Sequence, residues 1–124
     1  MEVLHPEVYN KNEEEEKKII LREYRALLRA LKQSLKKGDK ALLRHAFEIS
    51  VDAHKDMRRK SGEPYILHPL AVARIVVEEI GLGVTSAICA LLHDTVEDTE
   101  ITLEDIGREF NTYIAKIIDG LTKI

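Results

Sequence analysis

Residues 91–99 carry the side chains best suited to chemistry: an apolar run reading Leu-Leu passes directly into His-Asp-Thr-Val-Glu-Asp-Thr. Adjacent helical positions point about 100° apart, so His93 and Asp94 can both turn onto one cation near a helix end. If the helix continues, His93 shares a face with Glu97, and Asp94 shares one with Asp98. One helical turn is therefore expected to supply both metal ligands and acid/base groups.

A second interpretation of this string is that its carboxylates are solvated and close the helix, with His93 as a cation near the negative C-terminal end. That interpretation suits an isolated His-Asp pair. The full His-Asp-x-x-Glu-Asp string is expected by chance in only about one in a few thousand chains of this length. The longer pattern therefore favours a functional site.

A cluster of cations precedes this motif. Lys55, Arg58, Arg59 and Lys60 lie just before a Ser-Gly-Glu-Pro turn, in a chain whose formal net charge is −3. Guanidinium groups stack on bases and bind phosphates with two parallel hydrogen bonds, so the cluster is suited to a nucleotide. The alternative is an ordinary exposed basic loop.

The hydrophobic pattern predicts helices throughout and no strand of useful length. Residues 1–12 show no clear period and are expected to form a loose arm, with one domain over residues 13–124. The helices expected from apolar stripes cover about residues 13–37, 39–54 and 68–80, a fourth that begins at 85 or 86 and leads into His93 and Asp94, and then 102–110 and 113–121. The fold class is therefore all-α, an irregular bundle of five or six helices.

Several residues are expected to mark helix ends. Gly38 ends the first helix and Asp39 caps the second, while Thr85 or Ser86 caps the fourth. Thr102 with Asp105 matches a capping box. Within the helices, His54 is expected to bond a local carbonyl, with a functional role as the alternative. Cys89 is expected to be a small buried thiol, although one turn before His93 it is also a possible ligand.

The composition limits the class of protein. A chain of 124 residues, 44% hydrophobic and 33% charged, is typical of one soluble globular domain. No apolar run is long enough to span a membrane, and no signal peptide is apparent. The single cysteine excludes an internal disulfide and fits a reducing cytoplasm. The negative net charge argues against a general nucleic-acid binder.

Three strings together resemble the HD-superfamily hydrolase domain at the N-terminus of Rel/SpoT-type enzymes, which make and degrade the alarmone (p)ppGpp. The first is Arg-Lys-Ser-Gly-Glu-Pro-Tyr-Ile-Leu-His-Pro-Leu at 59–70; the others are residues 91–99 and Asp-Gly-Leu-Thr-Lys at 119–123. The spacing between the strings matches as well as their letters. Asp56 and Met57 depart from the Gly-Gln expected beside the basic cluster, a local difference.

The resemblance implies a site and a reaction. It makes His68, His93 and Asp94 ligands of a divalent metal, usually manganese, and gives Glu97 and Asp98 the task of arranging or activating the attacking water. The residues implied to hold the guanosine nucleotide are Arg59, Lys60 and Ser61. The reaction removes the 3′-pyrophosphate of (p)ppGpp to give GDP or GTP. Independently, a mixed imidazole and carboxylate site suits Mn, Fe or Zn.

The resemblance also implies that the hydrolase domain is incomplete at its C-terminus. The family takes a further aspartate ligand from a later helix, and it carries a synthetase domain and regulatory domains. The 124 residues are therefore expected to fold, to bind metal weakly and to hydrolyse (p)ppGpp poorly. Exposed apolar surface is expected to make a homo-oligomer possible.

Two other functions remain open at this point. One is an HD phosphohydrolase acting on another nucleotide, which the string at 59–65 disfavours. The other is a non-catalytic HD module that regulates a linked synthetase. Loss of ligands or of the Glu-Asp pair is the usual sign of such a module. Here the residues of both kinds that fall within the chain are all present: His68, His93, Asp94, Glu97 and Asp98.

Overall fold

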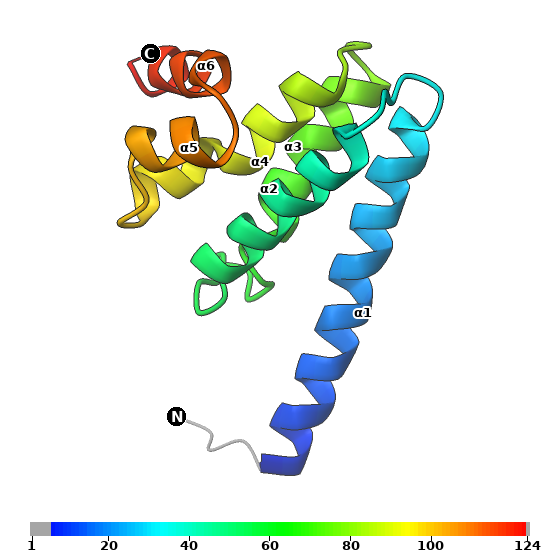
Figure 1. The fold of residues 1–124 in the computed structure, drawn as a ribbon. Coiled ribbons are helices and arrows are strands. Elements are labelled where there is room, and N and C mark those ends of the chain that lie inside the picture. Colours follow the sequence, from blue (N-terminus) through cyan, green and yellow to red (C-terminus); the bar gives the residue numbers. More distant parts are fainter. Residues whose placement is uncertain (1–5, 124) are drawn as a thin grey trace.

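The computed structural model describes residues 6–123, with side chains described from Glu13 to Lys123. Within these residues the fold consists of six α-helices and no β-strand, which confirms the expected all-α class (Figure 1). The helices are α1 (Pro6–Leu31), α2 (Asp39–Ala53), α3 (Leu67–Glu78), α4 (Val84–Asp98), α5 (Leu103–Glu109) and α6 (Thr112–Thr122).

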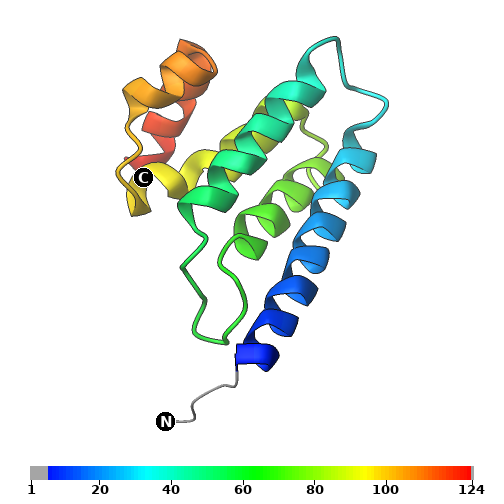
Figure 2. The same ribbon diagram turned by 60° about the horizontal axis from the view of Figure 1, so that its bottom comes forward.

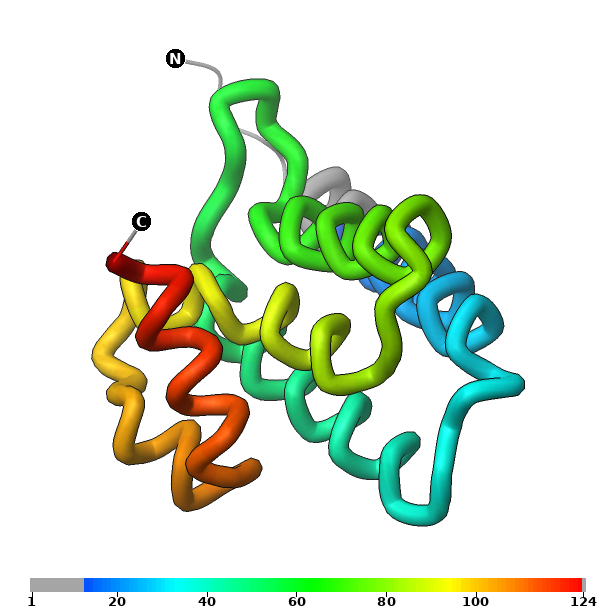
Figure 3. Tube along the Cα trace, turned by 90° about the horizontal axis from the view of Figure 1, so that it is seen from above, coloured from blue at the N-terminus to red at the C-terminus, as the bar shows by residue number. Residues whose placement is uncertain are grey.

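Helix α4 is the central element of the bundle. It packs against α2, α3 and α6, while α1 packs on α3 and α5 packs on α6. Seen from above, α5 and α6 lie together on the side of α4 away from α1 (Figure 3). The segment between α2 and α3 reaches toward the first half of α1 (Figure 2). Side chains on α4 are therefore positioned by contacts with α2, α3 and α6.

The apolar stripes of the helices meet in one core. Tyr24 of α1 stacks on Phe47 of α2 with ring centroids 4.2 Å apart. The fully buried aliphatic side chains are Leu27, Leu31, Leu43, Leu70, Ile88, Leu91, Leu92, Ile106 and Ile118. Burying each such side chain contributes about 1.5–3 kcal/mol to folding. Leu91 and Leu92 belong to this core, so the residues that follow them have a fixed starting direction.

The first helix differs from its expected range at both ends. It begins at Pro6 rather than Glu13, so part of the expected arm is helical, and residues 1–5 lie outside the described residues. It ends at Leu31 because the Ser34 hydroxyl and amide both donate to the Leu31 carbonyl, each at 2.9 Å, which closes the last turn. Leu35 still packs against the core after this turn.

The predicted helix caps were partly right. The capping box is confirmed: the Asp105 amide donates to Thr102 Oγ1 at 3.1 Å, and the Thr102 amide donates to Asp105 Oδ2 at 2.9 Å. The caps expected at Asp39 and at Thr85 or Ser86 are wrong. Glycines stand at those N-cap positions, Gly38 and Gly83.

The physical reason at α2 is a competing hydrogen bond. The Asp39 carboxylate accepts from the backbone amide of Lys36 at 2.8 Å and so stabilises the preceding turn instead of its own helix. That turn places Gly38 at φ 88°, a backbone conformation that glycine adopts without strain.

Each helix in the described chain is either too short or too polar to cross a lipid bilayer.

Candidate functional site

The candidate site lies at the C-terminal end of α4. Six residues of this helix face the core: Ala87, Ile88, Cys89, Leu91, Leu92 and Thr95. Because one face is buried from Ala87 to Thr95, the neighbouring positions His93 and Asp94 emerge half-buried at the edge of the core, and Glu97 emerges exposed one turn later. The burial pattern therefore places an imidazole and two carboxylates at one end of the helix.

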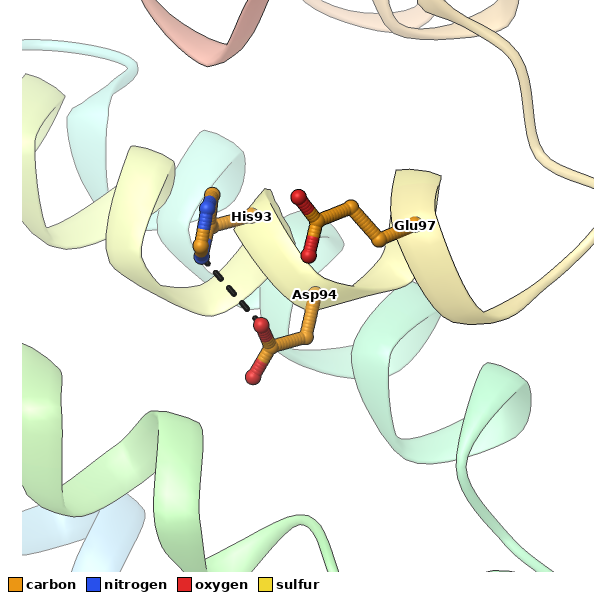
Figure 4. A group of neighbouring side chains, drawn as sticks. All are labelled: His93, Asp94 and Glu97. Carbon is orange, nitrogen blue, oxygen red and sulfur yellow. Dashed lines mark ion pairs between the residues drawn. The ribbon is translucent and has the colours of Figure 1, made fainter. Parts of the chain in front are cut away.

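These three side chains form a group that could hold a metal ion. One ligand atom from each of His93, Asp94 and Glu97 lies within 4.8 Å of those of the other two. His93 Nδ1 is 3.2 Å from Asp94 Oδ1, and both carboxylates extend back along α4 toward the imidazole (Figure 4). One nitrogen and several carboxylate oxygens make a donor set that suits Mn, Fe or Zn. The structure thus brings together His93 and Asp94, two of the expected ligands, and Glu97, which was expected to act on the water.

Tyr65 belongs to this site, although sequence reasoning did not single it out. Its hydroxyl donates a 2.8 Å hydrogen bond to Asp94 Oδ2, the oxygen not directed at His93 Nδ1. Burial raises the pKa of Tyr65 to about 12, with the hydrogen bond to Asp94 adding to the effect. The phenol therefore stays protonated and remains a donor at neutral pH. The sequence feature that could have identified Tyr65 is its position three residues before His68, an expected metal ligand.

His68, the first residue of the expected ligand set, lies on the same cavity wall. A cavity of about 510 Å³ runs between α3, α4 and α6, and His68, His93 and Asp94 line one part of it. The rings of Tyr65 and His68 meet edge to face with centroids 5.8 Å apart. Among the described residues, however, the group whose ligand atoms lie within 4.8 Å of one another consists of His93, Asp94 and Glu97, so His68 lies beside this group and not within it.

Asp98 ends α4 and is exposed. It does not join the group of three, but its negative charge contributes to the raised pKa of Tyr65. The Asp98 carboxylate therefore acts on the same region from the solvent side.

Residues 58–64 form a tight hairpin between α2 and α3, and this hairpin carries Arg58, Arg59 and Lys60 of the basic cluster. The Arg59 amide donates to the Glu63 carbonyl at 3.0 Å, and the Gly62 amide donates to the Arg59 carbonyl at 2.8 Å. Gly62 has φ 100°, which fits a three-residue loop in which a left-handed glycine follows a type I turn. This geometry exposes Lys60 and Ser61 at the tip.

Arg59 is the residue of the hairpin whose charge acts on Tyr65. Its guanidinium is 46% exposed and lies 4.0 Å from Glu63, and its positive charge acts against the raised pKa of Tyr65. Within the described chain, the wall of the 510 Å³ cavity comes from α3, α4, α6 and the loop residue Leu82, and not from Arg59, Lys60 or Ser61. The hairpin thus approaches the site from the Tyr65 side.

Two further residues have the structural environments expected of them. His54 Nδ1 donates to the Ser50 carbonyl at 3.0 Å, which leaves its buried Nε2 as an acceptor without a partner among the described residues. Its ring lies 4.9 Å from that of Tyr65. Cys89 is buried, and burial raises the pKa of its thiol to about 11.

Comparison with known proteins gives consistent matches. A family described as HD domain matches residues 46–124. The chain is 44% identical over 93 residues to a probable GTP pyrophosphokinase of Mycobacterium leprae, covering 75% of this chain and 12% of that protein. It is 45% identical over 82 residues to the guanosine-3′,5′-bis(diphosphate) 3′-pyrophosphohydrolase of Aquifex aeolicus, covering 66% of this chain and 12% of that protein.

The bifunctional (p)ppGpp synthase/hydrolase SpoT of Escherichia coli is 43% identical over 82 residues, again covering 66% of this chain and 12% of the longer protein. The chain thus spans about an eighth of the length of these curated relatives.

Proposed function

The chain belongs to the HD-domain family, and on this premise we propose that it is part of a metal-dependent hydrolase that removes the 3′-pyrophosphate of (p)ppGpp to give GDP or GTP. The observation that carries the proposal is the group formed by His93, Asp94 and Glu97 at the end of α4. The relatives support the substrate, because two of them are named for (p)ppGpp hydrolysis.

We assign the metal to His93 and Asp94, with His68 as a further ligand from the adjoining cavity wall and manganese as the ion. The imidazole and carboxylate donors fit such an ion. A bound divalent cation would supply positive charge to the pyrophosphate and make a water molecule more acidic. Tyr65 would hold Asp94 by one oxygen so that the other stays directed toward His93.

We assign the attacking water to Glu97 and Asp98. The position of Glu97 within the group of three supports this role, since its carboxylate could orient a water molecule there. Asp98 is exposed and outside the group, which leaves its oxygens available to accept the proton that the water loses. The water oxygen bonds to phosphorus, the bond from phosphorus to the 3′-oxygen breaks, and a 3′-hydroxyl forms.

We assign the guanosine nucleotide to the hairpin tip. The Arg59 guanidinium can stack on the base or bind a phosphate, Lys60 adds a positive charge, and the Ser61 hydroxyl adds a hydrogen-bonding group. All three are exposed. The charge of Arg59 acts on Tyr65, which itself contacts Asp94. Cations are needed here because the acidic group at the end of α4 would otherwise repel a substrate rich in phosphate.

The setting that we propose is the cytoplasm, where the single free thiol fits a reducing environment. The net charge of −3 favours a small nucleotide over nucleic acid as the partner. Exposed apolar side chains, among them Ile75, Ile80 and Leu82, favour self-association of the chain.

The test combines metal binding with pyrophosphate release. Titration calorimetry should show binding of Mn²⁺ to the chain, and the double variant His93→Ala/Asp94→Asn should lose it. Because the chain spans an eighth of its relatives, hydrolysis of (p)ppGpp is best measured on a hybrid in which this chain replaces the matching segment of the Aquifex aeolicus protein.

The hybrid should release pyrophosphate from (p)ppGpp in the presence of Mn²⁺ and lose this activity in the double variant. Release that is unaffected by the double variant, or a clear preference for another nucleotide in a substrate panel, would contradict the proposal.

A further inference from the structure

Arg58, which belongs to the same basic cluster as Arg59 and Lys60, bonds to the first helix. Its two guanidinium nitrogens donate to the two carboxylate oxygens of Glu16 on α1, at 2.7 and 2.8 Å. This is a bidentate pair between residues 42 positions apart. Glu16 is 24% exposed and Arg58 is 47% exposed. The first helix is therefore joined directly to the base of the hairpin.

The same guanidinium also spans the hairpin. Arg58 Nη1 donates to the Gly62 carbonyl at 2.7 Å, and Arg58 forms an isolated antiparallel bridge with Pro64. Gly62 is the left-handed residue on which the turn depends. Arg58 therefore bonds both to Glu16 on α1 and to Gly62, the residue that follows Lys60 and Ser61 at the tip of the hairpin. The hydrogen bond from Arg58 also holds the pKa of Glu16 below its usual range, so the pair is charged on both sides at neutral pH.

We propose that Glu16 and Arg58 are positioning residues that set the orientation of Arg59, Lys60 and Ser61 toward the nucleotide. The inference rests on the proposed function. Its physical basis is that a short hairpin with one isolated bridge has few bonds of its own, so its tip is oriented by what anchors its base. Here that anchor is a side chain of α1, and neither Glu16 nor Arg58 need touch the nucleotide.

An exposed ion pair adds little to global stability, so its loss should act locally. The chain offers a matched control. Glu23 on the same helix receives a 2.8 Å hydrogen bond from Arg74 of α3, which joins α1 to the bundle without touching the hairpin. Glu16→Gln and Glu23→Gln therefore remove the same charge from the same helix, and only the first releases the hairpin.

Two measurements distinguish a positioning role of the Glu16–Arg58 pair from a general loss of stability. Amide hydrogen exchange should accelerate at Arg59 and Gly62 in Glu16→Gln but not in Glu23→Gln, because both amides donate within the hairpin. The Kd for (p)ppGpp should rise roughly two- to fivefold in Glu16→Gln, the range expected of such a pair, while the Kd for Mn²⁺ stays unchanged. Arg58→Gln should have a larger effect, and adding Glu16→Gln to it should cause little further change.

The exchange measurement needs no nucleotide, so it tests the anchor even if the wild-type chain fails to bind (p)ppGpp, a failure that counts against the proposed function. Equal exchange and equal Kd values in Glu16→Gln and Glu23→Gln would overturn the positioning role. A parallel loss of Mn²⁺ binding in Glu16→Gln would overturn it too, because the pair would then support the metal-capable group and not the hairpin alone.

Discussion

Tyr65 and Asp94 are 29 residues apart, yet the Tyr65 hydroxyl donates a 2.8 Å hydrogen bond to one Asp94 oxygen while the other lies 3.2 Å from His93. Each oxygen of this carboxylate therefore has a distinct partner. Groups that orient a metal ligand in this way typically affect metal affinity by about 10–100-fold.

We expect Tyr65→Phe to weaken Mn²⁺ binding by about 10–100-fold, because the Asp94 carboxylate would then rotate freely. Titration calorimetry measures the affinity. Tyr113→Phe is the matched control, since Tyr113 is 66% exposed on α6. An unchanged affinity in Tyr65→Phe would show that packing alone holds Asp94 in place.

The proposed division of tasks between the hairpin and the end of α4 predicts two different kinetic defects. Arg59→Ala should mainly raise KM, because it removes a group that holds the nucleotide equally before and during reaction. Asp98→Asn should mainly lower kcat, because an amide cannot accept the proton of the attacking water. Steady-state kinetics on the hybrid protein measures both. Small and equal effects would leave the hairpin as ordinary surface.

The reactivity of Cys89 tests whether the core around α4 stays closed to solvent. The thiolate is the reactive form, and burial raises the pKa of this thiol to about 11. A chromogenic disulfide reagent at about pH 8 should therefore react slowly with the native chain and rapidly in denaturant. The chain has one cysteine, so the signal has a single source. Prompt reaction of the native chain would mean that the core around α4 opens frequently.

The contribution of the α5 cap to stability should be present at neutral pH and lost at low pH. The backbone amide of Thr102, followed by the Arg108 side chain, lowers the pKa of Asp105 in the folded state. The resulting stabilisation is fully present above the unfolded pKa, near pH 4, and is lost as the pH falls through the lower folded value. Asp105→Asn should therefore destabilise the chain to urea at about pH 7 and much less at about pH 3. An equal loss at both values would contradict an ionic contribution.

The features that sequence analysis predicted correctly depend on neighbours along the chain. The apolar spacing of Ile88, Leu91 and Leu92 identified the buried face of α4, and the half-buried His93 and Asp94 follow from it. The Thr102–Asp105 capping box involves residues three apart, so its letters are enough.

The features that were missed depend on how the helices dock. Tyr65 contacts Asp94 across 29 residues, and Arg58 contacts Glu16 across 42. Neither pairing has a periodic signal, because each requires a loop to fold back onto a helix that the pattern alone does not place. The N-caps at Gly38 and Gly83 were missed for another reason: a glycine cap offers no side-chain acceptor to recognise.

Helix α4 ends at Asp98, and the dipole of the helix makes this end electrostatically negative. The terminal carbonyls of a helix are equivalent to about half a negative charge, which here adds to the carboxylates of Asp94, Glu97 and Asp98. Before any cation arrives, this field repels a polyphosphate and attracts a divalent ion. Binding should therefore be ordered, with the ion entering first and reversing the local field, so that the apparent affinity for (p)ppGpp rises with the concentration of free metal.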